Sequence, residues 1–338
     1  MNFTLSQIAD LIDAELIGDG EVRIDGINAL DSAKTGQISY LANSKYQKTL
    51  CNSQASAVIL SSSHADSCPT NALIVSNPYH AFALVSHLFK QYNTTSNKPN
   101  EFSSIDSSAK VKGAIISSGC FVGKNVTIGK NSIIGPNCVI EDNVVIGDNA
   151  HFFANVVVHR GCQLGESCVI SSGVVIGSEG FGNARCEDMS WKTIAHMGKV
   201  VIGNDVTIGA NTTIDRGTIA DTEIHNGVRL DNLIHIAHNV IIGENTAIAA
   251  KTGIAGSTVL GKRCMIGGMV GIVGHISIAD DVVVNATSTV DKSVTRPGIY
   301  TGFFPLMTHK SWQKVGVWLI KLDKIAKILK IKLKDINK

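Results

Sequence analysis

The chain has 338 residues, of which 44% are hydrophobic and 5% aromatic, and a formal net charge of +2. This length allows more than one domain, and the small net charge gives no electrostatic sign of a nucleic-acid partner. The N-terminal segment carries Asp10 and Asp13 where a signal peptide needs an apolar stretch, and no run reaches the ~18 apolar residues of a membrane span. We therefore expect a cytoplasmic protein without nucleic-acid partners, with peripheral membrane contact as an open alternative.

Residues 1–100 form a first region, in which no six-residue period occurs. Thr4 is a suitable N-cap for a short helix, and the apolar stretches that follow have the length and composition of strands. A second helical stretch precedes the polar segment NTTSNKPNEFSS, which has the composition of a linker. The pattern predicts a small α/β domain.

Tyr40, Asn43 and Tyr46 are the candidate ligand-binding residues of this domain. Two aromatic rings could stack on the faces of a planar base while the amide between them bonds its edge. The spacing alone favours a simpler structure, a strand end with one ring buried.

Aliphatic residues recur every six positions between residues 107 and 295, in three runs that begin at Ile116, Ile202 and Ile224 and end at Ile176, Ala220 and Val290. A fixed period of six is the signature of a parallel β-helix, here of about nine coils with three hexads each. Residues two apart in a strand share a face, so the cysteines two positions before hexad residues should point into the interior as small hydrophobes. These cysteines are Cys120, Cys138, Cys162, Cys168 and Cys264.

Two segments depart from the repeat. Residues 178–197 form an excursion that contains Gly180, Gly182, Trp191 and His196, and a long excursion on a rigid solenoid is often functional. We expect it to border the acceptor site. Residues 306–338 have a largely helical apolar face and a lysine-rich polar side, which suit trimer packing, an acidic partner protein or a membrane surface.

His238 is the candidate catalytic residue, because it lies at a turn of the repeat. With 18 residues per coil, His238, Gly256 and Gly274 stack in one column, with His275 beside the last. An imidazole next to exposed backbone N–H groups can serve acyl transfer as a general base and an oxyanion donor, and Asp231 could orient the imidazole.

The histidines allow two other interpretations. A histidine at such a turn is often merely solvated. A zinc site at a trimer seam would need His235, His238, His225 and His275 to converge, and their positions do not share one column. We therefore expect no metal.

Several motifs together resemble the UDP-3-O-(3-hydroxyacyl)glucosamine N-acyltransferases of lipid A synthesis, a family of the hexapeptide-repeat acyltransferase superfamily. The resemblance covers nearly the whole chain and is carried by ISYLANSKY, GFG at 180–182, TTIDRG, DNLIHIAHNVIIG, AGS at 255–257, and IGG and VGH within 266–275. It implies a mainly β fold: a left-handed parallel β-helix with an N-terminal α/β domain and C-terminal helices. It also implies a homotrimer with active sites between adjacent β-helices.

The resemblance assigns roles to the candidate residues. His238 matches the catalytic base, Asp231 its partner, and Gly256 the glycine whose N–H faces the oxyanion. Tyr40, Asn43 and Tyr46 match the uracil-binding residues, although the first is usually Phe in the family. His275 matches a second active-site histidine near the nucleotide sugar, and Asn239 matches a substrate contact.

The implied reaction moves an (R)-3-hydroxyacyl group from acyl carrier protein to the 2-amino group of UDP-3-O-acylglucosamine. No cofactor is implied, since the acyl group arrives on the phosphopantetheine of the carrier protein. The lysine-rich tail would suit an acidic protein such as this carrier. Three alternatives stay open: an O-acyltransferase of the same pathway, an acetyltransferase for another sugar nucleotide, and a non-catalytic trimeric scaffold. The sequence does not give the acyl chain length.

Overall fold

The computed structural model describes residues 2–90, 102–111 and 113–329. The chain divides into two compact units, residues 1–93 and residues 94–338, and each is described by itself. No helix among the described residues is both long and apolar enough to cross a membrane.

The N-terminal unit is an α/β structure built on a five-stranded sheet in the order β2-β7-β6-β5-β4. All four residues of β6 are buried, as expected of a central parallel strand with both faces covered. Helix α1 begins at Thr4, whose hydroxyl and the Gln7 side chain form a reciprocal capping box. The elements are β1 (Phe3–Thr4), α1 (Leu5–Leu11), β2 (Glu15–Ile17), β3 (Arg23–Ile24), β4 (Gly26–Ile27), β5 (Gln37–Tyr40), η1 (Ser44–Tyr46), α2 (Gln47–Leu50), β6 (Ala57–Leu60), η2 (Ser62–Ser67), β7 (Asn71–Ile74) and α3 (Pro78–Leu88).

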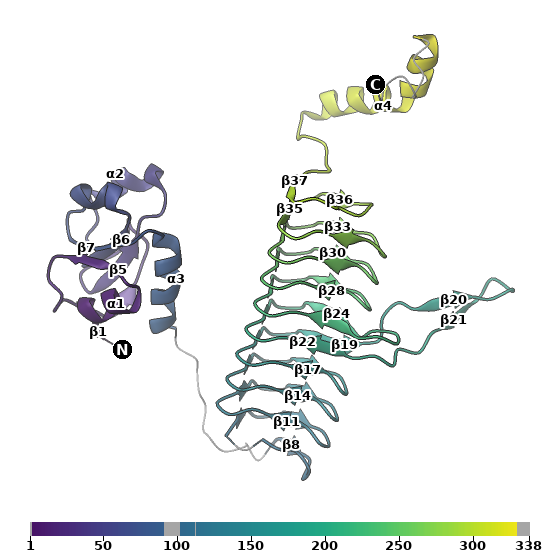
Figure 1. Cartoon of the computed structure of the whole chain (residues 1–338), viewed down its shortest axis with the longest axis horizontal. Helices are drawn as coiled ribbons and strands as arrows, with labels where there is room; N and C mark the ends of the chain where they lie inside the picture. Colours follow the sequence, from purple (N-terminus) through teal and green to yellow (C-terminus); the bar gives the residue numbers. More distant parts are fainter. Residues whose placement is uncertain (1, 91–101, 112, 330–338) are drawn as a thin grey trace. The chain divides into compact units, whose positions relative to one another are not determined.

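The second unit is a parallel β-helix whose three faces are sheets of 10, 8 and 10 strands (Figure 1). Face 1 contains β8 (Ser104–Ile105), β10 (Phe121–Val122), β13 (Val139–Ile140), β16 (Val157–Val158), β19 (Val175–Ser178), β24 (Thr213–Asp215), β27 (His235–Ile236), β30 (Gly253–Ile254), β33 (Gly271–Ile272) and β36 (Thr289–Val290). Face 2 contains β11 (Thr127–Ile128), β14 (Val145–Ile146), β17 (Gln163–Leu164), β22 (Val200–Ile202), β25 (Thr222–Ile224), β28 (Ile241–Ile242), β31 (Val259–Leu260) and β34 (Ser277–Ile278). Face 3 contains β9 (Ile115–Ile116), β12 (Ile133–Ile134), β15 (His151–Phe152), β18 (Val169–Ile170), β23 (Thr207–Ile208), β26 (Arg229–Leu230), β29 (Ala247–Ile248), β32 (Met265–Ile266), β35 (Val282–Val284) and β37 (Gly298–Tyr300).

The hexad residues fill the interior of the β-helix, which confirms the fold class predicted from the repeat. In most strands the second residue is the buried one, and each strand pairs in parallel with the strand one coil later, as Ile140 does with Val158. The predicted cysteines are all buried in this core. Many corner residues have positive φ and are asparagines, such as Asn137 and Asn155, because asparagine tolerates the left-handed conformation better than most residues.

One hexad assignment is wrong. Ala220 is exposed and lies in the loop between β24 and β25, so the middle aliphatic run ends at Ile214. The loop breaks the 18-residue register, and Ile214 therefore pairs with Ile236.

The excursion folds as an antiparallel hairpin of β20 (Asn183–Arg185) and β21 (Trp191–Thr193), which projects sideways from the β-helix (Figure 1). Near the C-terminus, α4 (His309–Ile328) begins at the N-cap Thr308 and buries none of its described residues. Its predicted apolar face includes Trp312 and Leu322, both exposed, whereas Ile336 lies outside the described residues.

Candidate active site

His238 lies at the corner that leads from face 1 to face 2, directly after β27. The amide of its neighbour Asn239 is fixed from two sides. Its Nδ2 donates to the carbonyl of Ala220 (2.7 Å), and its Oδ1 accepts from the backbone N–H (3.1 Å) and the hydroxyl (2.9 Å) of Thr218. The same Oδ1 lies 3.0 Å from His238 Nδ1. Because this oxygen can only accept, Nδ1 carries the proton and Nε2 keeps the free lone pair.

Gly256 occupies the same corner one coil later, as the predicted column requires. A Cβ atom at this position would lie 2.7 Å from His238 Cε1 and 2.8 Å from its Nε2. Only glycine therefore lets the imidazole lie against the backbone here.

The backbone N–H of Gly256 is available to a ligand. At the same corner in an earlier coil, Asp142 Oδ1 accepts a hydrogen bond from the N–H of Lys124 (2.7 Å). The residue equivalent to Asp142 above Gly256 is Gly274, which has no side chain to do this. Within residues 102–111 and 113–329, the Gly256 N–H meets no acceptor. A free base nitrogen and a free N–H donor thus lie side by side.

His275 lies one coil beyond Gly256, at the same corner. Its side chain is exposed, its φ is 60°, and its N–H donates to the Gly256 carbonyl (3.1 Å). The structure therefore places His275 beside Gly274, the last member of the predicted column, and against the backbone of Gly256.

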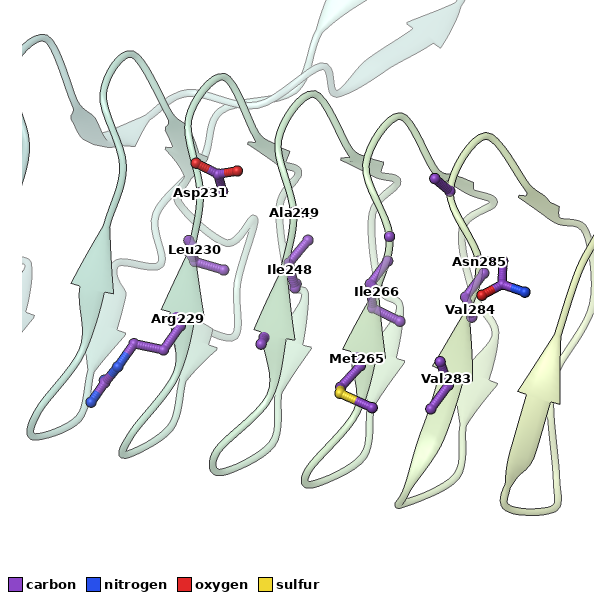
Figure 2. Close-up of a pocket in the computed structure, with 13 residues that line it drawn as sticks. Arg229, Leu230, Asp231, Ile248, Ala249, Met265, Ile266, Val283, Val284 and Asn285 are labelled. Atoms are coloured by element: carbon purple, nitrogen blue, oxygen red, sulfur yellow. The ribbon is translucent and has the colours of Figure 1, made fainter. Parts of the chain in front are cut away.

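Asp231 lies at a different corner, directly after β26 on face 3. Its carboxylate accepts hydrogen bonds from the N–H of Asn232 (2.8 Å) and of Ala250 (3.1 Å). Figure 2 shows Asp231 above an apolar surface of β26, β29, β32 and β35. This pocket has a volume of about 480 Å³ and is lined by side chains that include Ala247 and Met265. Within one chain, the structure does not bring Asp231 and His238 together.

The base of the excursion lies against His238. His196 is 1% exposed, its Nδ1 donates to the Ile194 carbonyl (2.9 Å), and its ring centroid lies 5.5 Å from that of His238. Gly180 packs against both rings, since a Cβ at this position would lie 3.1 Å from His196 Nε2 and 3.1 Å from His238 Cδ2. Sequence reasoning placed the excursion near the acceptor site but gave His196 no role.

Asp215, at the end of β24, is a second residue of this site that sequence reasoning missed. It is 5% exposed, accepts a hydrogen bond from the Ser178 hydroxyl (2.8 Å), and its Oδ2 lies 3.6 Å from His235 Nε2. Burial raises the pKa of Asp215, against the lowering effects of Ser178 and of the nearby histidines His235, His238 and His196. Its place within the motif TTIDRG was the only sequence signal.

The N-terminal unit brings Tyr40, Asn43 and Tyr46 to one pocket of about 490 Å³, which Tyr79 also lines. The Tyr40 ring stacks on Phe82 with centroids 4.0 Å apart, and the Tyr46 ring is 61% exposed. Asn43 Oδ1 caps the helix η1 by accepting from the N–H of Lys45 (3.0 Å). The amide Nδ2 of Asn43 can then donate to a ligand between the rings.

The histidines considered for a zinc site have other partners. His225 pairs with Glu223 (3.3 Å) and His235 lies near Asp215. Across the described ranges, no three His, Cys, Asp or Glu side chains gather in a way that could hold a metal ion.

Known proteins share both parts of the chain. Residues 21–88 match the family model described as UDP-3-O-(3-hydroxymyristoyl) glucosamine N-acyltransferase. The model of the bacterial transferase hexapeptide matches residues 143–178 and 221–256, and the model of the succinyl-transferase hexapeptide repeat matches residues 113–160, 199–220 and 257–292.

Full-length relatives are named UDP-3-O-acylglucosamine N-acyltransferase. The relative from Vesicomyosocius okutanii is 55% identical over 334 residues, and that from Ruthia magnifica is 56% identical over 335 residues, each covering 99% of both chains. The relative from Coxiella burnetii strain RSA 493 is 37% identical over 331 residues, which is 98% of this chain and 97% of the relative. The chain therefore belongs to the UDP-3-O-acylglucosamine N-acyltransferase family.

Proposed function

We propose that this chain transfers a 3-hydroxyacyl group from acyl carrier protein to the 2-amino group of UDP-3-O-acylglucosamine, a step of lipid A synthesis in the cytoplasm. Membership of the family supports the reaction class. The observation that carries the proposal is the pairing of a free His238 Nε2 with a free Gly256 N–H at one corner of the β-helix.

The proposed mechanism uses these two groups in sequence. The amine nitrogen attacks the thioester carbonyl carbon while His238 Nε2 takes up a proton from that nitrogen. The carbonyl oxygen becomes an oxyanion that accepts a hydrogen bond from the Gly256 N–H. Collapse of the tetrahedral intermediate forms the amide and breaks the C–S bond, and the leaving thiolate takes the proton from His238. No metal or bound cofactor takes part, because the thioester is already an activated acyl group.

Each of the two units has its own proposed contacts with the acceptor. The rings of Tyr40 and Tyr46 stack on the uracil, and the Asn43 amide bonds its edge. His275 and Asn239, which share the corner of His238, contact the sugar nucleotide near the reacting amine.

The role assigned to Asp231 requires a second copy of the chain. Asp231 and His238 lie at different corners of the β-helix, so an Asp231 that acts on His238 would have to come from a neighbouring subunit. This agrees with the homotrimer that the family resemblance implies. A neighbouring subunit would also cover the apolar pocket beside Asp231, where Met265 is 57% exposed.

The experiment is a transfer assay with product identification. Purified protein is incubated with 3-hydroxyacyl carrier protein and UDP-3-O-acylglucosamine, and mass spectrometry identifies the amide product. Parallel reactions offer acetyl-CoA as donor or UDP-N-acetylglucosamine as acceptor. An amide formed only with the first pair supports the proposal. Transfer only in the parallel reactions assigns the chain to another acyltransferase class, and transfer in none of them leaves the scaffold alternative.

A further inference from the structure

The group that accepts the hydrogen bond from His238 Nδ1 is uncharged. In a Ser-His-Asp triad, the group bonded to Nδ1 is a carboxylate, which stabilises the imidazolium formed during the reaction. Here the acceptor is the neutral amide of Asn239, and Asp231 of the same chain lies at another corner. Within one chain, the imidazolium that forms when His238 takes the amine proton therefore has no carboxylate bonded to it, and a buried carboxylate nearby would act in addition to the neighbouring subunit's Asp231.

We infer that Asp215 is the carboxylate that stabilises protonated His238, and that the excursion buries Asp215 for this role. The inference rests on the proposed function, because it assigns a positioning residue to the same acyl-transfer site. It differs from the family resemblance, which points only to Asp231.

The sheet register places Asp215 beside the His238 corner. Strands β24 and β27 pair in parallel with Ile214 next to Ile236, so Asp215 lies next to Ala237, the residue before His238. The Ser178 hydroxyl holds one oxygen of the carboxylate at 2.8 Å.

The excursion changes the surroundings of this carboxylate. Ile214 is the inward residue of β24, so Asp215 lies on the outward side, where a side chain would ordinarily be solvated. Asp215 is nevertheless only 5% exposed, and Ser178, with which it bonds, is the residue where the chain leaves face 1 for the excursion. A charge shielded from water acts more strongly on its neighbours than a solvated one.

The charged or titratable groups near Asp215 among the described residues are three imidazoles and the guanidinium of Arg216. The titratable groups acting on it are His235, His238 and His196. The neighbouring Arg216 directs its guanidinium to the carbonyl of Arg160 (2.5 Å). The carboxylate is therefore left to favour a proton on one of the imidazoles.

Of these three imidazoles, His238 is the one whose protonated form Asp215 stabilises. His196 Nε2 is buried without a partner among the described residues, so a proton there would leave a buried N–H unsatisfied. His235 Nε2 lies 3.6 Å from Asp215 Oδ2, but the His235 side chain is 54% exposed, so water weakens the effect of the carboxylate on it. His238 is partly buried and receives a proton in each catalytic cycle.

Asp215→Asn tests this inference, since it keeps the size and the acceptor for Ser178 while removing the charge. We expect kcat to fall about tenfold and the acidic limb of the pH–rate profile to move about one unit to lower pH. KM for both substrates should stay within about twofold, because Asp215 is only 5% exposed and the proposed mechanism gives it no contact with either substrate. Asp142→Asn makes the same change at the same corner of an earlier coil, where it caps the Lys124 N–H, and should leave the profile unchanged.

A second readout does not depend on activity. Diethylpyrocarbonate reacts with neutral imidazole, so labelling of His238 against pH, followed by peptide mass spectrometry, reports its protonation. In Asp215→Asn the labelling midpoint should move to lower pH. An unmoved midpoint and an unmoved rate profile in a folded variant would overturn the inference, and so would the same two shifts in His235→Gln. Absence of transfer by the wild-type protein would instead count against the proposed function.

Discussion

Asn239 Oδ1 lies 3.0 Å from His238 Nδ1, and this contact decides which imidazole nitrogen can act as the base. The amide cannot rotate freely, because its other end donates to the Ala220 carbonyl and its oxygen also accepts from Thr218. The loop that interrupts the hexad pattern thus holds the residue that sets the tautomer. In the proposed mechanism, loss of the regular repeat at this point serves to orient the base.

Asn239→Ala should lower kcat about 10- to 100-fold, because the imidazole loses its orienting acceptor and samples unproductive geometries. Asn245→Ala is the matched control. Both residues are corner asparagines with positive φ, at 60° and 57°, so both variants pay the same backbone strain of about 1 kcal/mol. Steady-state kinetics at matched folded fraction separates the two effects. Equal losses in both variants would show that Asn239 matters only for the fold.

Gly256→Ala should lower kcat about 100-fold, since the added methyl group would displace the imidazole from its position against the backbone. Gly253→Ala adds the same group three residues earlier, where a Cβ meets nothing within 4 Å. That control should retain wild-type rates. Thermal unfolding of both variants checks that the difference does not come from stability, and full activity of Gly256→Ala would rule out the proposed contact.

Mixed trimers test whether Asp231 acts across subunits. Asp231→Ala and His238→Ala should each be nearly inactive alone. Refolding the two together should restore activity, because some sites then combine an intact Asp231 from one subunit with an intact His238 from its neighbour. Activity no higher than the sum of the separate variants would mean that the two residues serve one chain, or that Asp231 has no role in positioning the base.

Tyr46→Ala should raise KM for the UDP-sugar acceptor about tenfold and leave KM for the acyl carrier protein unchanged, because an aromatic ring stacked on a base contributes about 1–3 kcal/mol. The ring is 61% exposed, so the melting temperature should barely change. Tyr46→Phe keeps the ring and should keep the wild-type KM. Competition by UMP measured on the same variants reports the nucleotide contact directly, and equal inhibition of all three proteins would exclude it.

The fold could be predicted from the sequence because the β-helix is periodic. Each inward residue repeats the one six positions before, so Ile140 and Ile146 are buried for the same reason. The same periodicity predicts that His238 and Gly256 stack in one column. The assignment of Ala220 as a hexad residue is wrong, because an aliphatic side chain at the right spacing does not show whether the backbone still follows the coil.

The rest of the site depends on contacts outside the period. Asp215 is buried where the excursion begins and His196 is a buried residue of the excursion itself, whose path no spacing rule describes. Asp231 follows the period but lies at a different corner of the β-helix, so it does not reach His238 of the same chain. The spacing of Tyr40 and Tyr46 alone favours a plain strand end, and only the pocket that they line indicates a binding site.

The most direct test of the central claim is single-turnover acyl transfer from 3-hydroxyacyl carrier protein to UDP-3-O-acylglucosamine, comparing wild type with His238→Ala at matched oligomer content. We predict a loss of about 10²- to 10⁴-fold, the contribution of a general base. An active wild type with an equally active His238→Ala variant would contradict the assignment of the base.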